Sequence, residues 1–156
     1  MALTLTSSAF GTGETIPFKY TCEGENISPI EWRSLLEATQ SLILILDDPD
    51  ASSGTEGPFA HWVIYNIPPG IDRLAEGFHP NDLPGWPGST GRNSFGNTDY
   101  EGSCPPRGET HRYYFRLYAL DTLLDLFRGA TRAKVIDHVK GHLLENTELM
   151  ASFIRP

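Results

Sequence analysis

The most constraining feature of this 156-residue chain is a continuous apolar run that ends abruptly at acidic residues. The run from Leu42 to Leu46 contains only leucine and isoleucine, and its length suits a strand buried on both faces. It stops at Asp47-Asp48-Pro49-Asp50, where the proline removes a backbone donor and pushes the residue before it toward an extended conformation. We therefore expect a buried strand that ends in a polar loop.

Two further strands are expected, and each opens with a histidine. The first, His61 to Ile67, is largely apolar and follows a small, polar loop. The second, His111 to Leu120, alternates between two faces. The face expected toward a core holds His111, Tyr113, Phe115, Leu117 and Ala119. The other face, here called the aromatic–arginine face, holds Arg112, Tyr114, Arg116 and Tyr118 and is expected to be half exposed.

Simple topology brings the polar ends of these strands together. If the first two strands are antiparallel neighbours, the end of the first lies beside the start of the second. Asp48 and Asp50 then lie near His61. A third strand that enters the same sheet at the same rim adds His111 to the group.

The rest of the chain predicts one domain, residues 1–156, with strands first and helices last. Short strands are expected at residues 3–6, 16–20 and 30–32, the second an edge strand because it contains a proline. Residues 71–102 form a long loop rich in proline and glycine. A helix capped by Thr131 should run to about Leu144, and a second should span Thr147 to Ile154. This order favours a mainly β fold, an antiparallel sheet or sandwich with a few peripheral helices.

The net charge of −8 and the pI of about 5.0 argue against nucleic acid and anionic lipid surfaces as general partners. The longest apolar run is far too short to span a bilayer, and residues 1–10 do not resemble a signal peptide. We therefore expect a soluble cytoplasmic protein with reduced thiols. A Cys22–Cys104 bridge remains the alternative.

The converging residues suggest a pocket for a small anion such as phosphate or a phosphorylated headgroup. Asp48, Asp50, His61, His111 and Tyr113 would surround it, beside the loop from Gly102 to Gly108. Imidazoles beside carboxylates stay charged to higher pH, and loop N–H groups add donors. The carboxylates would favour a ligand that also carries a proton or an amine.

Other interpretations of these residues remain open. Asp48-Pro49-Asp50 is also a typical turn, and each histidine has a purely structural interpretation. Two histidines and two aspartates could ligate zinc or iron, although the chain contains no metal-binding motif. Cys104 precedes His111 by seven positions and is a weak candidate nucleophile. No G-x-S-x-G motif supports a serine hydrolase.

Several blocks of the sequence resemble the phosphatidylethanolamine-binding protein family, which includes the Raf kinase inhibitor proteins. The two main blocks are Asp48-Pro49-Asp50-Ala51 with Ala60 to Pro68, and Tyr100 to Gly108 with His111-Arg112-Tyr113. Further matches are similar to the short bacterial and archaeal branch: Tyr20 to Gly24, Ser28-Pro29, Gly91-Arg92-Asn93, Leu117 to Asp121 and Lys140-Gly141-His142.

The resemblance implies an antiparallel β-sandwich with an anion pocket at one end. Matched residue by residue, the ligand-binding set is Asp48, Asp50, His61, Gly102, His111 and Tyr113, with Pro49, Cys104 and Pro105 in the wall. We expect a regulatory binding module rather than an enzyme, with no catalytic residue, cofactor or metal. The alternatives are a protein inhibitor of a kinase or protease that uses residues 71–102, and a hydrolase or metal-dependent enzyme. A homodimer through the aromatic–arginine face is a further possibility.

Overall fold

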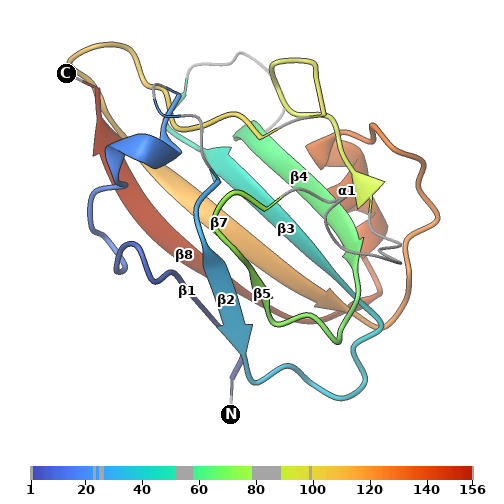
Figure 1. The fold of residues 1–156 in the computed structure, drawn as a ribbon. Coiled ribbons are helices and arrows are strands. Elements are labelled where there is room, and N and C mark those ends of the chain that lie inside the picture. Colours follow the sequence, from blue (N-terminus) through green and yellow to red (C-terminus); the bar gives the residue numbers. More distant parts are fainter. Residues whose placement is uncertain are drawn as a thin grey trace.

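The computed structural model describes residues 2–22, 24, 27–51, 58–78, 89–98 and 100–155, whose strands form two antiparallel sheets (Figure 1). The larger sheet has, in spatial order, β6 (Ser89–Thr90), β4 (Phe59–Ile67), β3 (Ser41–Asp48), β7 (Thr110–Leu120) and β8 (Leu143–Ile154). The smaller sheet has β1 (Thr4–Thr6), β2 (Ile30–Arg33) and β5 (Arg73–Leu74). The mainly β, antiparallel sandwich predicted from the sequence is confirmed.

Strand β3 is the centre of the larger sheet, and all eight of its residues are buried. It pairs antiparallel with β4 on one side and with β7 on the other. A strand with neighbours at both edges and cover on both faces needs apolar side chains in both directions, which explains the unbroken run from Leu42 to Leu46. The expected pairing of β3 with the strand that begins near His61 is also confirmed.

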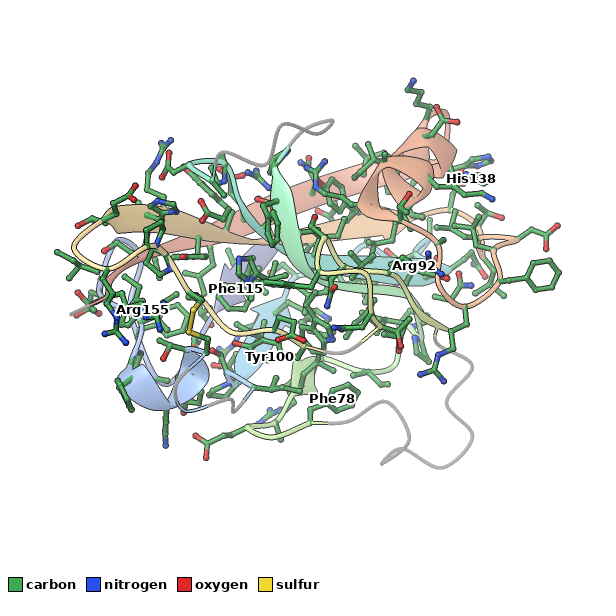
Figure 2. The ribbon with its side chains drawn as sticks, turned by 90° about the horizontal axis from the view of Figure 1, so that it is seen from above. Phe78, Arg92, Tyr100, Phe115, His138 and Arg155 are labelled. Carbon is green, nitrogen blue, oxygen red and sulfur yellow. A yellow bond between two sulfur atoms is a disulfide. The ribbon has the colours of Figure 1, made fainter. Side chains whose placement is uncertain are left out.

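The two faces of the larger sheet are covered by different parts of the molecule. The main core lies between the two sheets and includes Trp32, Trp62 and Phe115, the last labelled in Figure 2. A second cluster lies on the opposite face, where Ile43 and Val63 belong to the same apolar group as Val135 of the helix. Figure 1 shows this helix, α1 (Arg132–Val139), packed behind the sheet. Successive residues of β3 and β7 therefore face two different cores.

Helix α1 has the predicted start but ends earlier than expected. The Thr131 side chain accepts a hydrogen bond from the Lys134 N–H at 3.3 Å, which confirms the N-cap. The chain leaves the helix at Lys140, and Gly141 then adopts a φ of 82°, a left-handed conformation that glycine adopts without strain. None of the helices in the described part of the chain combines the length and hydrophobicity needed to cross a bilayer.

The predicted second helix, Thr147–Ile154, is wrong. These residues form most of β8, which pairs with β7 along nearly its full length. The decisive pattern has a period of two: Leu149, Ala151 and Phe153 are all buried in the main core. Strand pairing along β7 satisfies the backbone of this segment and outweighs its weak helical spacing.

The predicted edge strand at residues 16–20 is also wrong, because Phe18–Tyr20 forms the 3₁₀ helix η1. Its turn is closed by the Tyr20 N–H, which donates to the Pro17 carbonyl at 3.0 Å. Proline at position 17 cannot donate to a strand ladder, so a tight turn is the lower-energy solution.

The two cysteines form a disulfide, so the expectation of reduced thiols is wrong and the alternative bridge is present. Cys22 and Cys104 have Cα atoms 5.4 Å apart although they are 82 positions apart in the sequence (yellow bond in Figure 2). Their loops also run side by side, and the Cys22 N–H donates to the Ser103 carbonyl at 3.1 Å. The link fastens the loop before β7 to the segment that follows η1.

Candidate ligand-binding site

The candidate site lies at the rim where β3 ends and where β4 and β7 begin. Asp48, the last residue of β3, is paired with Phe59 at the start of β4. On the other edge of β3, Asp47 is paired with Tyr114 of β7. His111, near the start of β7, lies close enough for its Nδ1 to be 2.6 Å from Oδ2 of Asp48. The sheet register therefore brings the three predicted segments together.

His111 lies between two carboxylates. Its Nδ1 contacts Asp48, and its Nε2 lies 3.4 Å from Oε1 of Glu109. Carboxylate oxygens accept hydrogen bonds, so this arrangement favours a proton on both ring nitrogens. Burial lowers the pKa of His111, but the hydrogen bonds and charges of Asp48 and Glu109 outweigh it and raise the pKa overall. The site thus contains a cationic imidazole.

The two aspartates of the site are fixed by other groups. Oδ1 of Asp48 accepts the Asp50 N–H at 2.8 Å, while its other oxygen faces His111. Asp50 accepts three hydrogen bonds from Arg112, from the backbone N–H at 2.8 Å, Nε at 3.0 Å and Nη2 at 2.8 Å. The Arg112 hydrogen bonds lower the pKa of Asp50 to about 2 against the opposing effect of burial. Each carboxylate therefore has its own cationic partner.

His61 differs from His111 because it has no carboxylate hydrogen-bonded to its ring. It is only 3% exposed, and its Nδ1 lies 2.9 Å from the Glu101 carbonyl oxygen. A carbonyl can only accept, so Nδ1 carries the proton and donates. Burial is the largest influence and lowers the pKa of His61. We conclude that His61 is neutral, with the lone pair on Nε2.

These residues line a cavity of about 390 Å³. Its lining consists of Asp48, Asp50, Ala51, Phe59, His61, Phe95, Cys104, Pro106, Glu109 and His111. The apolar wall is an aromatic cluster in which the ring centroids of Phe59 and Phe95 lie 4.9 Å apart and those of Phe95 and His61 lie 5.5 Å apart. The cavity is therefore apolar on one side and carries titratable groups on the other.

Five of the predicted site residues line this cavity: Asp48, Asp50, His61, Cys104 and His111. Tyr113 is fully buried behind it, with its ring centroid 5.5 Å from that of His61 and 6.5 Å from that of His111. Burial, reinforced by the charge of Asp48, raises the pKa of Tyr113, so its hydroxyl stays protonated. Tyr113 supports the two imidazole rings.

The other three predicted residues, Gly102, Pro49 and Pro105, are not among the lining residues. Gly102 packs against the backbone of Thr21 and Cys22, where a Cβ atom would collide with the Thr21 carbonyl carbon. Its role in this structure is to let the two disulfide-linked loops approach. In the wall, Pro106 takes the place predicted for Pro105, which is buried beneath the loop.

Sequence reasoning missed Ala51, Phe59, Phe95, Pro106 and Glu109. Phe59 was recoverable, because it lies two positions before His61 on the same face of β4. Phe95 had no sequence signal, since its position depends on a turn fastened to β4 by the Ser94 N–H, which donates to the Ala60 carbonyl at 2.8 Å. Glu109 was visible only as a neighbour of the predicted His111.

A separate charged cluster lies on the opposite face of the sheet. Asp47 is fully buried there, and its Oδ2 accepts hydrogen bonds from Nε of Arg116 at 2.9 Å and Nε of Arg132 at 3.2 Å. Arg116 also pairs with Glu148 at 2.7 Å and lies 4.4 Å from the Tyr114 ring centroid. Much of the aromatic–arginine face is thus occupied by contacts within the chain.

No group of three or more histidine, cysteine, aspartate or glutamate residues in the described ranges is arranged to hold a metal ion. Part of the loop predicted to contact a protein target, residues 79–88 and 99, lies outside the described residues. The predicted roles in metal binding and protein inhibition therefore stay predictions.

Comparison with known proteins agrees with the fold and the sequence blocks. The family model of the phosphatidylethanolamine-binding proteins matches residues 6–154. The chain belongs to this family. A relative from Methanothermobacter thermautotrophicus, a UPF0098 protein, is 45% identical over 98% of this chain and 99% of its own length.

Two solved structures of family members superpose over almost the whole chain. A phosphatidylethanolamine-binding protein homologue from Chlamydia trachomatis is 35% identical, with a TM-score of 0.88 over 99% of both chains. YbcL of E. coli is 27% identical, with a TM-score of 0.89 over 100% of both chains. The two sheets and the helix of this member of the family therefore follow an established family architecture.

Proposed function

We propose that the cavity at the β3, β4 and β7 rim binds a small phosphorylated ligand, and that the protein acts as a regulatory binding module without catalysis. The observation that carries this proposal is the cationic His111, held by Asp48 on the wall of a cavity of ligand size. A buried imidazolium with an open approach is a suitable donor to an anionic oxygen.

The charge of the cavity further defines the ligand. His111 offsets Asp48 and Arg112 offsets Asp50, so the nearby negative charge left without its own cation belongs to Glu109. Glu109 lies at the exposed rim, with 58% of its side chain accessible. A ligand with an anionic phosphoryl group and a cationic amine would match this pattern better than a bare polyanion. Phosphorylethanolamine is the simplest such compound.

Isothermal titration calorimetry with phosphorylethanolamine tests the proposal. The variant His111→Gln should bind at least about tenfold more weakly, because it loses a charge-assisted hydrogen bond. The matched control is His138→Gln, which alters an exposed histidine of α1 whose Nδ1 contacts only the Lys134 carbonyl. Equal affinity of all three proteins, or no binding by the wild type at millimolar ligand, would sink the proposal.

The cytoplasmic location remains part of the proposal and now has a sharper test. Disulfides persist mainly in oxidising compartments, and intracellular proteins of hyperthermophiles are the principal exception. Rapid alkylation of thiols in intact cells, followed by fractionation, would report both properties at once. Oxidised Cys22–Cys104 in a periplasmic or extracellular fraction would contradict a cytoplasmic location.

A further inference from the structure

The two histidines of the cavity present opposite hydrogen-bonding groups to a ligand. His61 donates from Nδ1 to the Glu101 carbonyl at 2.9 Å, which leaves Nε2 as an acceptor. Within the described residues, no hydrogen bond engages this Nε2. A ligand atom that approaches it must therefore bring its own hydrogen.

His111 presents a donor at the other side of the cavity. Its Nδ1–H is held by Asp48 at 2.6 Å, so the ring orientation is fixed. Its Nε2–H faces Glu109 at 3.4 Å, a long contact to an exposed side chain. A ligand oxygen can replace Glu109 at this position without disturbing the Asp48 pair.

The other polar groups around the cavity are mainly acceptors. Asp48, Asp50 and Glu109 contribute carboxylates, while Phe59 and Phe95 contribute apolar surface. An oxyanion without a proton would place one oxygen lone pair against His61 Nε2 and others near these carboxylates. Such an unmatched polar contact in a buried site costs about 1–3 kcal/mol.

Building on the function proposed above, we propose that the cavity selects phosphoryl groups that carry a proton, with His61 as the residue that determines this selectivity. The ligand's P–O–H would donate to Nε2 of His61, while an unprotonated oxygen of the same group accepts from Nε2–H of His111. Phosphate monoesters have a second pKa of about 6, so this proton is available near neutral pH. Sulfate and phosphodiesters lack it in that range. The ligand class is therefore free phosphate or a phosphomonoester, and the phosphodiester of an intact phospholipid is excluded.

Four small probes test this selectivity at about pH 6 by calorimetry. Inorganic phosphate is compared with sulfate, and methyl phosphate with dimethyl phosphate, because each pair differs mainly in the available proton. We expect phosphate and methyl phosphate to bind at least about tenfold more tightly than their partners.

Two variants separate the acceptor at His61 from the general negative charge. His61→Gln places an amide that can also donate near the Nε2 position, so the phosphate-to-sulfate affinity ratio should fall severalfold. Glu109→Gln removes only rim charge, so it should strengthen the binding of both anions and leave their ratio unchanged. A long-range ¹H–¹⁵N spectrum of the wild type should show His61 as the Nδ1–H tautomer.

The possible outcomes are distinct. If sulfate binds within about threefold of phosphate, or if His61 carries protons on both nitrogens at this pH, the selectivity inference is overturned while phosphoryl binding stands. If none of the probes binds, the proposed function fails as well. Selective binding that is lost in His61→Gln but kept in Glu109→Gln supports the inference.

Discussion

Asp47 and Asp48 are consecutive residues of β3, yet their carboxylates serve two very different environments. Both are buried, with exposed fractions of 0% and 2%, and they point to opposite faces of the sheet. Asp47 is neutralised by Arg116 and Arg132, whose charge does not change with pH in the normal range. Asp48 is neutralised by His111, which can titrate and which lines a cavity.

The difference teaches how one strand end can be structural on one face and functional on the other. The Asp47 cluster ties β3 to β7 and α1 through permanent charges and opens to no described cavity. The Asp48 cluster keeps donors and acceptors available for a ligand. We expect changes on the Asp47 face to affect stability and changes on the Asp48 face to affect binding.

The largest expected effect is on the Asp47 face. Asp47→Asn keeps the side-chain shape but leaves two mostly buried arginines without their shared anion, so the free energy of unfolding should fall by about 3 kcal/mol. Chemical denaturation measures this loss, and phosphate affinity of the remaining folded protein should be unchanged. A variant as stable as the wild type would show that the arginines find other partners.

The disulfide is the covalent support of the cavity side, and its loss should have the next largest effect. Cys22→Ser combined with Cys104→Ser should lower the free energy of unfolding by about 2–4 kcal/mol. Phosphate binding should weaken too, because the Glu101 carbonyl that orients His61 lies in the same loop. The wild type in reductant is the control, and its denaturation midpoint should move toward that of the variant.

The pH dependence of stability should separate the two aspartates. Because the pKa of His111 is raised, the stabilisation from its pair with Asp48 is complete below the unfolded histidine pKa of about 6.5. It is lost as pH rises through the higher folded-state pKa. His61, whose pKa is lowered by burial, acts in the opposite direction, since its contribution is lost as pH falls below about 6.5.

The difference between wild type and His111→Gln isolates the first contribution. Measured by denaturation from about pH 5 to pH 9, this difference should be largest at low pH and shrink as pH rises. The difference between wild type and Asp47→Asn should stay flat over the same range, because arginine does not titrate there. A difference curve for His111→Gln that grows with pH would mean that His111 is neutral in the folded protein.

The smallest effect is expected at the rim. Glu109→Gln changes an exposed side chain, so stability should stay within about 0.5 kcal/mol of the wild type. Phosphate affinity should nevertheless rise about two- to fivefold as the repulsion is removed. Weaker phosphate binding in this variant would indicate that Glu109 holds His111 in its binding geometry.

The sequence was sufficient for the centre of the fold and for the polar end of β3. An apolar run with an acidic end specifies a buried strand, and the hairpin geometry then brings Asp48 to His61 and His111. It was insufficient where distant segments decide the outcome. Strand β8 depends on pairing with β7, Phe95 on a turn fastened to β4, and the disulfide on two loops 82 positions apart. The division between Asp47 and Asp48 also required knowing what covers each face.

The most direct test of the cavity is a titration of the wild-type protein with phosphate, followed by side-chain ¹H–¹⁵N signals of its histidines. The ring signals of His61 and His111 should shift together in a saturable manner. Those of His138 and His142, which are exposed and contact only the Lys134 carbonyl and the Asp121 carboxylate, should remain in place. Movement of the two cavity histidines alone is the predicted result. Unchanged signals from His61 and His111 at millimolar phosphate would contradict the account.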